Sequence, residues 1–284
     1  MAADAISWIH APAKLNLNLR ITGRRDDGYH LLDSVVVFTD FGDWINLEPA
    51  QQDKVAVTGD FASFVSTSED NICLRALAAF RDHGGVTGCH TITIEKRIPV
   101  GAGLGGGSSN AAVILRYLNG TSPKPLADTR LAEAALSLGA DVPVCLAGTA
   151  QRMQGIGDLL IPVDPVPHGH LVLAGADVML PTERVFQSLR ESGSKEAEPL
   201  RSSEISGSVA DIIAAGNDLQ VAAMSLSPDI ARVLDRLRDG NGVIATQMSG
   251  SGSACFGLFN NGDDAITAAK TLAQEGIWAV ATKF

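Results

Sequence analysis

The chain has 284 residues, of which 45% are hydrophobic and 19% are charged, and its formal net charge is −10. This length suits one large domain or two moderate ones, and the composition excludes an intrinsically disordered chain. The acidic balance argues against non-specific binding of nucleic acid, which needs a basic surface. It does not exclude a phosphate ligand held by backbone N–H groups. We therefore predict no nucleic-acid partner.

The chain's four cysteines are far apart in the sequence and form no Cys-x-x-Cys pair. They are typical of the reduced thiols of a cytoplasmic protein. The first residues lack the basic region and apolar run of a signal peptide, and no stretch approaches the ~18 apolar residues of a membrane span. We therefore predict a cytoplasmic protein with no membrane partner. His168 and His170 have no nearby cluster of ligand-type residues, so we predict a surface turn there and no metal site.

The first half of the chain alternates strand-like and helix-like segments. Short β-branched runs at residues 34–38, 44–47 and 54–57 predict three strands with turns between them. Residues 72–80 predict a helix that stops at Gly84-Gly85, and residues 91–94 predict a further strand.

A glycine-rich segment follows, reading Pro-Val-Gly-Ala-Gly-Leu-Gly-Gly-Gly-Ser-Ser-Asn over residues 99–110. Its glycines leave backbone N–H groups uncovered and can adopt positive φ. The run at residues 111–118 predicts a helix directly after it. A glycine loop before a helix N-terminus collects free donors and the positive end of the helix dipole, which suits a polyphosphate. A flexible linker is the alternative, and the amphipathic helix that follows disfavours it.

Two common phosphate motifs do not fit this segment. The P-loop pattern needs a lysine after the glycines, but Ser108 stands at that position. Gly101, Gly103 and Gly106 meet the dinucleotide pattern formally. However, residues 95–100 separate the preceding strand from the glycines, whereas in a Rossmann unit the strand leads straight into the turn.

Residues 131–138 predict another helix, which Gly139 ends. A proline-rich stretch containing Pro162, Pro165 and Pro167 then predicts a domain junction, so we divide the chain into residues 1–164 and 165–284.

The second half predicts an antiparallel sheet with helices on one face, an α+β architecture. Residues 191–210, rich in Ser and Glu, predict a mobile surface segment. The predicted strands are residues 171–174, 243–247, 254–259 and 277–281, and the predicted helices are residues 217–225, 229–238 and 264–274.

Three separated motifs resemble the GHMP kinase superfamily, whose members phosphorylate small metabolites with ATP. They are Ala-Pro-Ala-Lys-Leu-Asn-Leu at residues 11–17, the glycine segment, and Met-Ser-Gly-Ser-Gly-Ser-Ala-Cys at residues 248–255. The added glycine before Ser108-Ser109-Asn110 is similar to the superfamily members that act on a cytidine diphosphate-linked methylerythritol. So are Gly-Tyr-His at residues 28–30, Gly-Ala-Asp-Val-Pro at 139–143 and Gly-Ile-Gly-Asp at 155–158.

The resemblance implies a two-domain α+β fold, with an N-terminal α/β domain that binds ATP and a C-terminal ferredoxin-like domain that completes the substrate site. It implies transfer of phosphate from ATP, with Mg²⁺, to the 2-hydroxyl of the methylerythritol substrate in non-mevalonate isoprenoid synthesis. A monomer or a weak homodimer is expected. The alternatives are a homoserine or mevalonate type of GHMP kinase, or a catalytically silent nucleotide-binding module.

The resemblance also assigns two catalytic residues. Asp141 would act as the base on the substrate hydroxyl, and the residue-level alternative is an N-cap carboxylate. Lys14 would lie beside that aspartate, lowering its pKa and stabilising charge on the transferred group. A solvated lysine is the alternative.

The binding residues follow from the same motifs. The predicted ATP-binding residues are Asn71, Pro99, Val100, Gly101, Ala102, Gly103, Leu104, Gly105, Gly106, Gly107, Ser108, Ser109 and Asn110; a helix cap explains Asn71 equally well. Asn16, Tyr29, His30, Thr182 and Phe186 would bind the substrate, Tyr29, His30 and Phe186 through its cytosine; a plain core residue is the alternative for Phe186. Residues 249–253 would complete the site from the second domain, or form only a hairpin turn.

Overall fold

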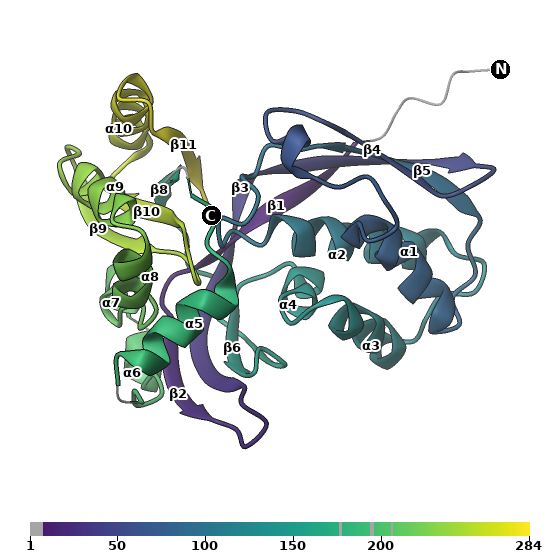
Figure 1. Ribbon diagram of the computed structural model, residues 1–284, viewed down its shortest axis with the longest axis horizontal. Coiled ribbons are helices and arrows are strands. Elements are labelled where there is room, and N and C mark those ends of the chain that lie inside the picture. Colours follow the sequence, from purple (N-terminus) through teal and green to yellow (C-terminus); the bar gives the residue numbers. More distant parts are fainter. Residues whose placement is uncertain (1–7, 176–177, 194–195, 206) are drawn as a thin grey trace. The chain divides into compact units, whose positions relative to one another are not determined.

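The computed structural model describes residues 8–175, 178–193, 196–205 and 207–284 (Figure 1). The chain divides into two compact units that alternate along the sequence. The first unit comprises the chain up to Ala13, residues 42–100 and residues 105–148; the second comprises residues 14–41, 101–104 and 149–284. The boundary predicted between residues 164 and 165 stays a prediction, and the chain passes between the two units several times before that point.

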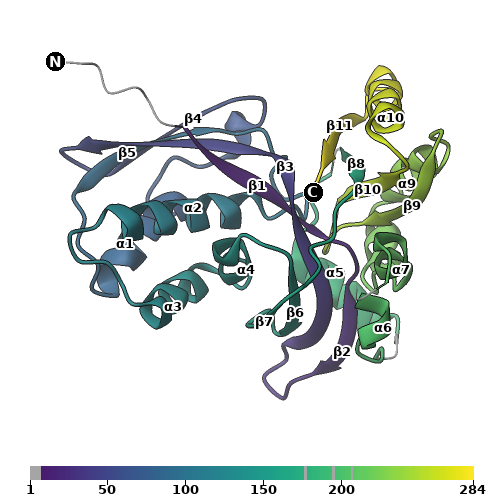
Figure 2. The ribbon, with the colours of Figure 1, turned by 180° about the vertical axis from the view of Figure 1, so that it is seen from behind.

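The first unit combines a sheet with four helices that lie on one of its faces (Figures 1 and 2). Strand β5 pairs antiparallel with residues 44–50 of β3 and parallel with β4. Every second residue of β5 is buried, which is the pattern of a strand with one covered face. The elements of this unit are the first part of β1 (Ile9–Asn16), the last part of β3 (His30–Ala50), β4 (Lys54–Thr58), β5 (Cys89–Glu95), a short 3-10 helix η1 (Ala62–Phe64), α1 (Ile72–Asp82), α2 (Gly106–Thr121), α3 (Asp128–Leu138) and α4 (Val142–Ala147).

The predicted separation of residues 34–38 from 44–47 is wrong, because both belong to the single strand β3. Gly42 lies midway between them. A side chain there would put its Cβ 2.3 Å from the carbonyl oxygen of Ala11, so the glycine lets the backbone of β1 approach closely. Gly42 is therefore a close-packing site inside a strand and not part of a turn.

The helix predicted at residues 111–118 begins five residues earlier, at Gly106. Residues 106–110 therefore form the first turn of α2 and not a loop. Every residue of α2 from Ser109 to Leu115 is buried. This tertiary burial outweighs the low helix propensity of its two leading glycines.

The second unit contains a four-stranded antiparallel sheet in the order β11-β8-β10-β9. Numbered within the unit, these strands run 4-1-3-2, with helices after the first and the third, which is the ferredoxin-like arrangement. The predicted α+β class and the ferredoxin-like second half are confirmed. The elements are β8 (His170–Gly175), α5 (Thr182–Glu191), α6 (Ser202–Ile205), α7 (Val209–Ala214), α8 (Gln220–Leu226), α9 (Asp229–Arg238), β9 (Val243–Met248), β10 (Ala254–Phe259), α10 (Gly262–Gln274) and β11 (Trp278–Lys283).

The core of this unit lies between the sheet and its helices. Val172 and Ala174 of β8 pack in one cluster with Val185 of α5, Leu234 of α9 and Ala269 of α10. All five are buried. This shared apolar core is what holds the helices on the sheet.

The second unit also holds β2 (Arg20–Arg24), the first part of β3, β6 (Gln151–Gly155) and β7 (Leu159–Pro162). Part of the segment predicted to be a mobile surface is fixed against these strands. The N–H of Leu200 donates to Asp33 Oδ2 at 2.9 Å, and the N–H of Ala197 donates to the carbonyl of Ile21 at 2.7 Å. Arg152 also binds Asp33, at 2.9 and 2.6 Å. The surface prediction is therefore wrong at Leu200, which is buried.

Candidate active site

The glycine segment forms a turn that only glycine accommodates easily. Gly101, Gly103 and Gly105 have φ values of +70°, +75° and +62°. Gly105 is the N-cap residue of α2, and because it has no side chain it cannot accept a hydrogen bond from the first N–H groups of the helix. The first N–H of the helix to find an intrahelical partner is that of Ser109, which donates to Gly105 at 2.8 Å. Helix geometry leaves the preceding N–H groups without such partners, and so they can bind an anion.

All three sequence motifs contribute to one hydrogen-bonded cluster within the second unit. The N–H of Lys14 donates to the carbonyl of Leu104 at 2.9 Å, and the N–H of Ala254 donates to the carbonyl of Ala102 at 3.0 Å. Ser249 connects the motifs further, since its Oγ accepts from the N–H of Asn16 at 3.2 Å and lies 3.3 Å from the carbonyl oxygen of Gly103. Residues 14–16, 102–104 and 249–254, far apart in sequence, thus meet.

Lys14 is held inside this cluster. Its Nζ donates to Asn16 Oδ1 at 2.9 Å, and both residues are buried, with 4% and 1% of their surface exposed. Asn16 Nδ2 in turn donates to Ser34 Oγ at 2.7 Å, which orients the amide with its oxygen toward the ammonium. The solvated-lysine alternative is therefore wrong. Hydrogen bonds thus hold the Lys14 side chain in place, and its catalytic role stays a prediction.

Asp141 lies at the N-cap position of α4, with Pro143 in the helix's first turn. Its side chain makes no capping hydrogen bond, so the N-cap interpretation of the carboxylate is wrong. The residue is half-buried. Asp141 belongs to the first unit and Lys14 to the second, and their proximity stays a prediction.

Asn71 is the N-cap of α1, which confirms the cap interpretation. Its Oδ1 accepts from the N–H of Cys73 at 2.8 Å, and its Nδ2 donates to the carbonyl of Ser66 at 2.5 Å. Pro99 and Val100 are half-buried immediately before the glycine turn. A role for these three residues in binding ATP stays a prediction.

The predicted cytosine contacts lie on β3, its preceding turn and α5. The rings of His30 and Phe186 stack with centroids 4.8 Å apart and planes 27° from parallel, and Phe186 also packs against the core cluster. Tyr29 is 63% exposed. Thr182 is the first residue of α5, and its Oγ1 lies 2.9 Å from Ser251 Oγ in the third motif.

The environment of His30 favours the neutral form of its ring. Partial burial and the positive charges of Arg190 and Arg24 lower the pKa of His30 from 6.5. Arg24 lies directly opposite His30 across the pairing of β2 with β3, and Arg190 lies one helical turn after Phe186 on α5. A neutral imidazole offers one hydrogen-bond donor and one acceptor.

Comparison with known proteins identifies the family. Residues 71–149 match GHMP kinases N terminal domain, and residues 205–277 match GHMP kinases C terminal. A 4-diphosphocytidyl-2-C-methyl-D-erythritol kinase of Cereibacter sphaeroides is 44% identical over 273 residues, covering 94% of this chain and 95% of that protein. The chain belongs to the 4-diphosphocytidyl-2-C-methyl-D-erythritol kinase family.

Solved structures agree with this family and with the fold. A crystal structure of 4-(cytidine 5'-diphospho)-2C-methyl-D-erythritol kinase is 32% identical, with a TM-score of 0.81 and 98% coverage of both chains. The mevalonate kinase of Methanococcus jannaschii shares the fold alone, at 13% identity and a TM-score of 0.67. The full-length relatives therefore favour this kinase family over the mevalonate type.

Several residues around the family's motifs were not found by sequence reasoning. Ser34 orients Asn16, and Asn217 Nδ2 donates to the carbonyls of Met248 and Gly250, each at 2.8 Å. Neither residue lies in a recognisable pattern. The buried ion pair of Lys96 with Asp43 was also missed. The available signal was the six-residue segment 95–100 that separates the strand from the glycine turn, because Lys96 lies in it.

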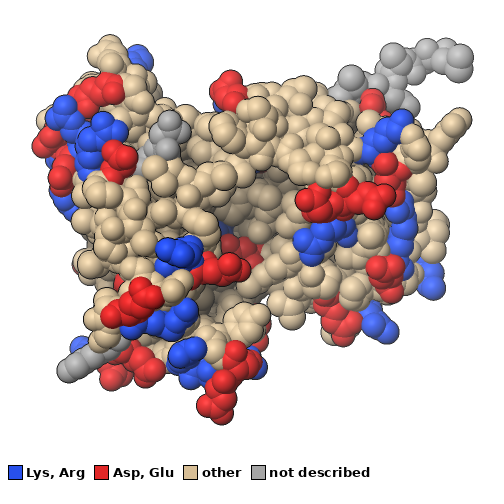
Figure 3. All heavy atoms as spheres, in the orientation of Figure 1, with Lys and Arg blue, Asp and Glu red and all other residues tan. Residues whose placement is uncertain are grey.

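The cysteines, the surface charge and the helices were each the subject of an expectation drawn from composition. All four cysteines are free, and burial raises the pKa of Cys73 and of Cys255 to about 12. On the face in Figure 3, basic and acidic side chains are interspersed, and the coloured residues form no continuous basic surface. Over the described part of the chain, every helix is too short or too polar to cross a bilayer.

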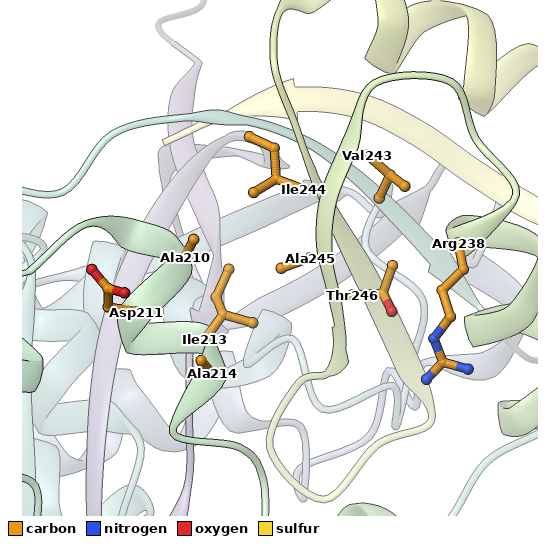
Figure 4. Close-up of a pocket in the computed structure, with 9 residues that line it drawn as sticks. All are labelled: Ala210, Asp211, Ile213, Ala214, Arg238, Val243, Ile244, Ala245 and Thr246. Atoms are coloured by element: carbon orange, nitrogen blue, oxygen red, sulfur yellow. The ribbon is translucent and has the colours of Figure 1, made fainter.

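A hollow in the second unit lies apart from the predicted motifs. Residues of α7, the end of α9 and the edge strand β9 line it, and its polar side chains include Asp211, Arg238 and Thr246 (Figure 4). Asp211 is engaged in the capping box of α7 with Ser208, and Arg238 binds Asp235 at 2.5 Å. None of the lining residues belongs to the predicted site.

Proposed function

We propose that this chain transfers the γ-phosphate of ATP to the 2-hydroxyl of 4-diphosphocytidyl-2-C-methyl-D-erythritol. The observation that carries the proposal is the cluster in which Lys14, Asn16 and Ser249 surround the glycine turn. Membership of the kinase family supports the choice of both ATP and the cytidine diphosphate-linked substrate.

The glycine turn and the first turn of α2 would hold the triphosphate. Phosphoryl transfer depends on positioning and charge neutralisation more than on covalent chemistry. The N–H groups of residues 106–108 at the positive end of a 16-residue helix supply both.

The acceptor hydroxyl would lie between Lys14 and Asp141. Asp141 would accept or orient the hydroxyl proton as the oxygen attacks the γ-phosphorus. The Lys14 ammonium, kept in place by Asn16, would keep the carboxylate ionised and stabilise charge on the transferring phosphoryl group.

Mg²⁺ would accompany the triphosphate. Mg²⁺ at nucleotide sites uses few protein ligands and several phosphate oxygens or waters. Among the described residues, no three His, Cys, Asp or Glu lie in position to hold a metal ion. The hydroxyls of Ser108 and Ser109 are the candidate protein contacts. When bound, Mg²⁺ would neutralise charge on the phosphate oxygens.

The cytosine would bind at the stack of His30 and Phe186, with Tyr29 closing over its free face. Aromatic rings stack on a pyrimidine, and imidazole can hydrogen-bond to its polar edge. Thr182 at the start of α5 would contact a substrate phosphate. We propose a cytoplasmic enzyme, a monomer or weak homodimer, with no nucleic-acid partner.

The direct test incubates the purified protein with ATP, Mg²⁺ and 4-diphosphocytidyl-2-C-methyl-D-erythritol. ADP and a 2-phospho product, identified by mass spectrometry and phosphorus NMR, are expected. Turnover of mevalonate or homoserine in its place would move the chain to another GHMP kinase activity. Nucleotide binding without any turnover would favour a silent nucleotide-binding module.

Replacing Tyr29 tests the cytosine contact. We expect Tyr29→Ala to raise KM for the substrate by about tenfold, since base stacking contributes roughly 1–3 kcal/mol, with little change in KM for ATP. Steady-state kinetics with each substrate varied in turn measure both constants. Phe64→Ala is the matched control, because Phe64 is equally exposed, at 63%, but lies outside the predicted site. An unchanged substrate KM in Tyr29→Ala would exclude the contact.

The lowered pKa of His30 predicts the pH dependence of substrate binding. With its pKa lowered by burial and by the two arginines, the ring takes up a proton only at a more acidic pH than an ordinary histidine does. KM for the substrate should therefore be flat from pH 8 to 6.5 and rise only at more acidic pH. This prediction is checked by measuring KM for the substrate from pH 8 to below pH 6.5 in the wild type and in His30→Asn. In the variant, KM should not rise at acidic pH, because asparagine does not titrate. A rise that starts above pH 6.5 would contradict the environment described for His30.

A further inference from the structure

The first unit contains a deeply buried ion pair that none of the predicted site residues explains. Lys96 Nζ lies 2.5 Å from Asp43 Oδ2, and their side chains are only 5% and 0% exposed. Asp43 lies in β3, and Lys96 lies between β5 and the glycine turn. Removing two charges from water costs more than a typical pair returns, so a pair at this depth is weak evidence for stability alone.

Asp43 also holds the backbone that leads to the glycine turn. Its Oδ1 accepts from the N–H groups of Arg97 and Ile98, each at 2.8 Å. One carboxylate thus binds three consecutive residues, from Lys96 to Ile98, directly before Pro99. The path of the chain into the turn is set by this carboxylate.

Lys96 lies against the first residue of α2. A Cβ built on Gly106 would be 2.7 Å from Lys96 Nζ and 3.1 Å from Ile98 Cγ2. The ammonium cannot move aside without breaking its bond to Asp43. By contrast, a Cβ on Gly107 would meet only Ile72, at an ordinary 3.6 Å. The backbone at the start of α2 therefore packs closely against the side chains of Lys96 and Ile98.

We propose that Lys96 and Asp43 are positioning residues for the triphosphate of ATP. Resting on the proposed function, this inference adds that the pair sets where the N–H groups of residues 106–108 point. The pair is neutral overall, so its effect comes from geometry and not from added positive charge. It should therefore govern the affinity for ATP and leave the affinity for the cytidine diphosphate-linked substrate unchanged.

The test compares Lys96→Met and the double variant Lys96→Met/Asp43→Asn with wild type, well below their melting temperatures. We expect KM for ATP to rise by about tenfold, because small misplacements of binding groups are costly. KM for the cytidine diphosphate-linked substrate should stay within about twofold of the wild-type value. Amide hydrogen exchange at residues 105–109 should quicken in the absence of nucleotide. The double variant leaves no buried charge unpaired and keeps an oxygen for the N–H groups of Arg97 and Ile98. If the single variant does not fold, the double variant alone is used to test the inference.

Arg81→Met is the matched control. Arg81 pairs with Asp53, which likewise accepts a backbone N–H, that of His90 at 2.9 Å, in the same unit. This control should keep the wild-type ATP KM and the wild-type exchange at residues 105–109. A folded double variant with wild-type ATP KM and exchange would overturn the inference. A wild-type protein that binds no ATP would refute the proposed function instead, and the exchange measurement would still decide the positioning role.

Discussion

The variant Asp141→Asn is expected to lose kcat by about 10² or more, the usual contribution of a general base, while KM for ATP changes little. Asparagine preserves the size of the side chain but cannot accept a proton from the substrate hydroxyl. Since the Asp141 side chain makes no capping bond to α4, the helix should keep its stability. The measurement is steady-state kinetics combined with calorimetric binding of ATP.

Asp128→Asn controls for the loss of a carboxylate near a helix start in the same unit. Asp128 is the exposed first residue of α3 and has no predicted role in the site. Its substitution should leave kcat within about twofold. Normal turnover in Asp141→Asn would remove Asp141 from the mechanism. Loss of ATP binding together with turnover would instead indicate that Asp141 has a structural role.

The second large effect is expected from Gly103→Ala. Gly103 has φ +75°, and an added Cβ would lie 2.7 Å from the carbonyl oxygen of Ser249 and 2.8 Å from that of Gly252. The left-handed backbone costs alanine about 1–2 kcal/mol, and overpacking against backbone adds roughly 1–3 kcal/mol. The turn and the third motif must therefore separate, and KM for ATP should rise by about tenfold or more while the melting temperature falls.

Gly120→Ala is the control for a glycine substitution. Gly120 lies in α2, where an added Cβ would meet nothing within 4 Å. Alanine there should raise the melting temperature slightly, because it favours a helix interior by roughly 0.5–1 kcal/mol over glycine. A Gly103→Ala variant with wild-type stability and ATP KM would show that the packing of the third motif against the turn has no functional importance.

Local patterns predicted most elements of the fold. The helix beginning after Asn71, the α9 helix at residues 229–238 and the strands of the ferredoxin-like half appear close to the predicted positions. Capping residues, helical periodicity and β-branched runs are effects of neighbouring residues, so they can be read in sequence. The joined strand β3 and the early start of α2 were missed, since Gly42 and Gly106 are used for close packing against distant segments.

The sequence by itself supplied the candidates for the proposed chemistry: the lysine, the aspartate, the glycine turn and the aromatic side chains. Only the tertiary structure decided that Asn16 meets Ser249, that Lys14 is buried against Asn16, and that Lys96 pairs with Asp43 beneath Gly106. These contacts join residues up to 233 positions apart. They depend on strand register and on the burial of whole elements, which no short-range preference encodes.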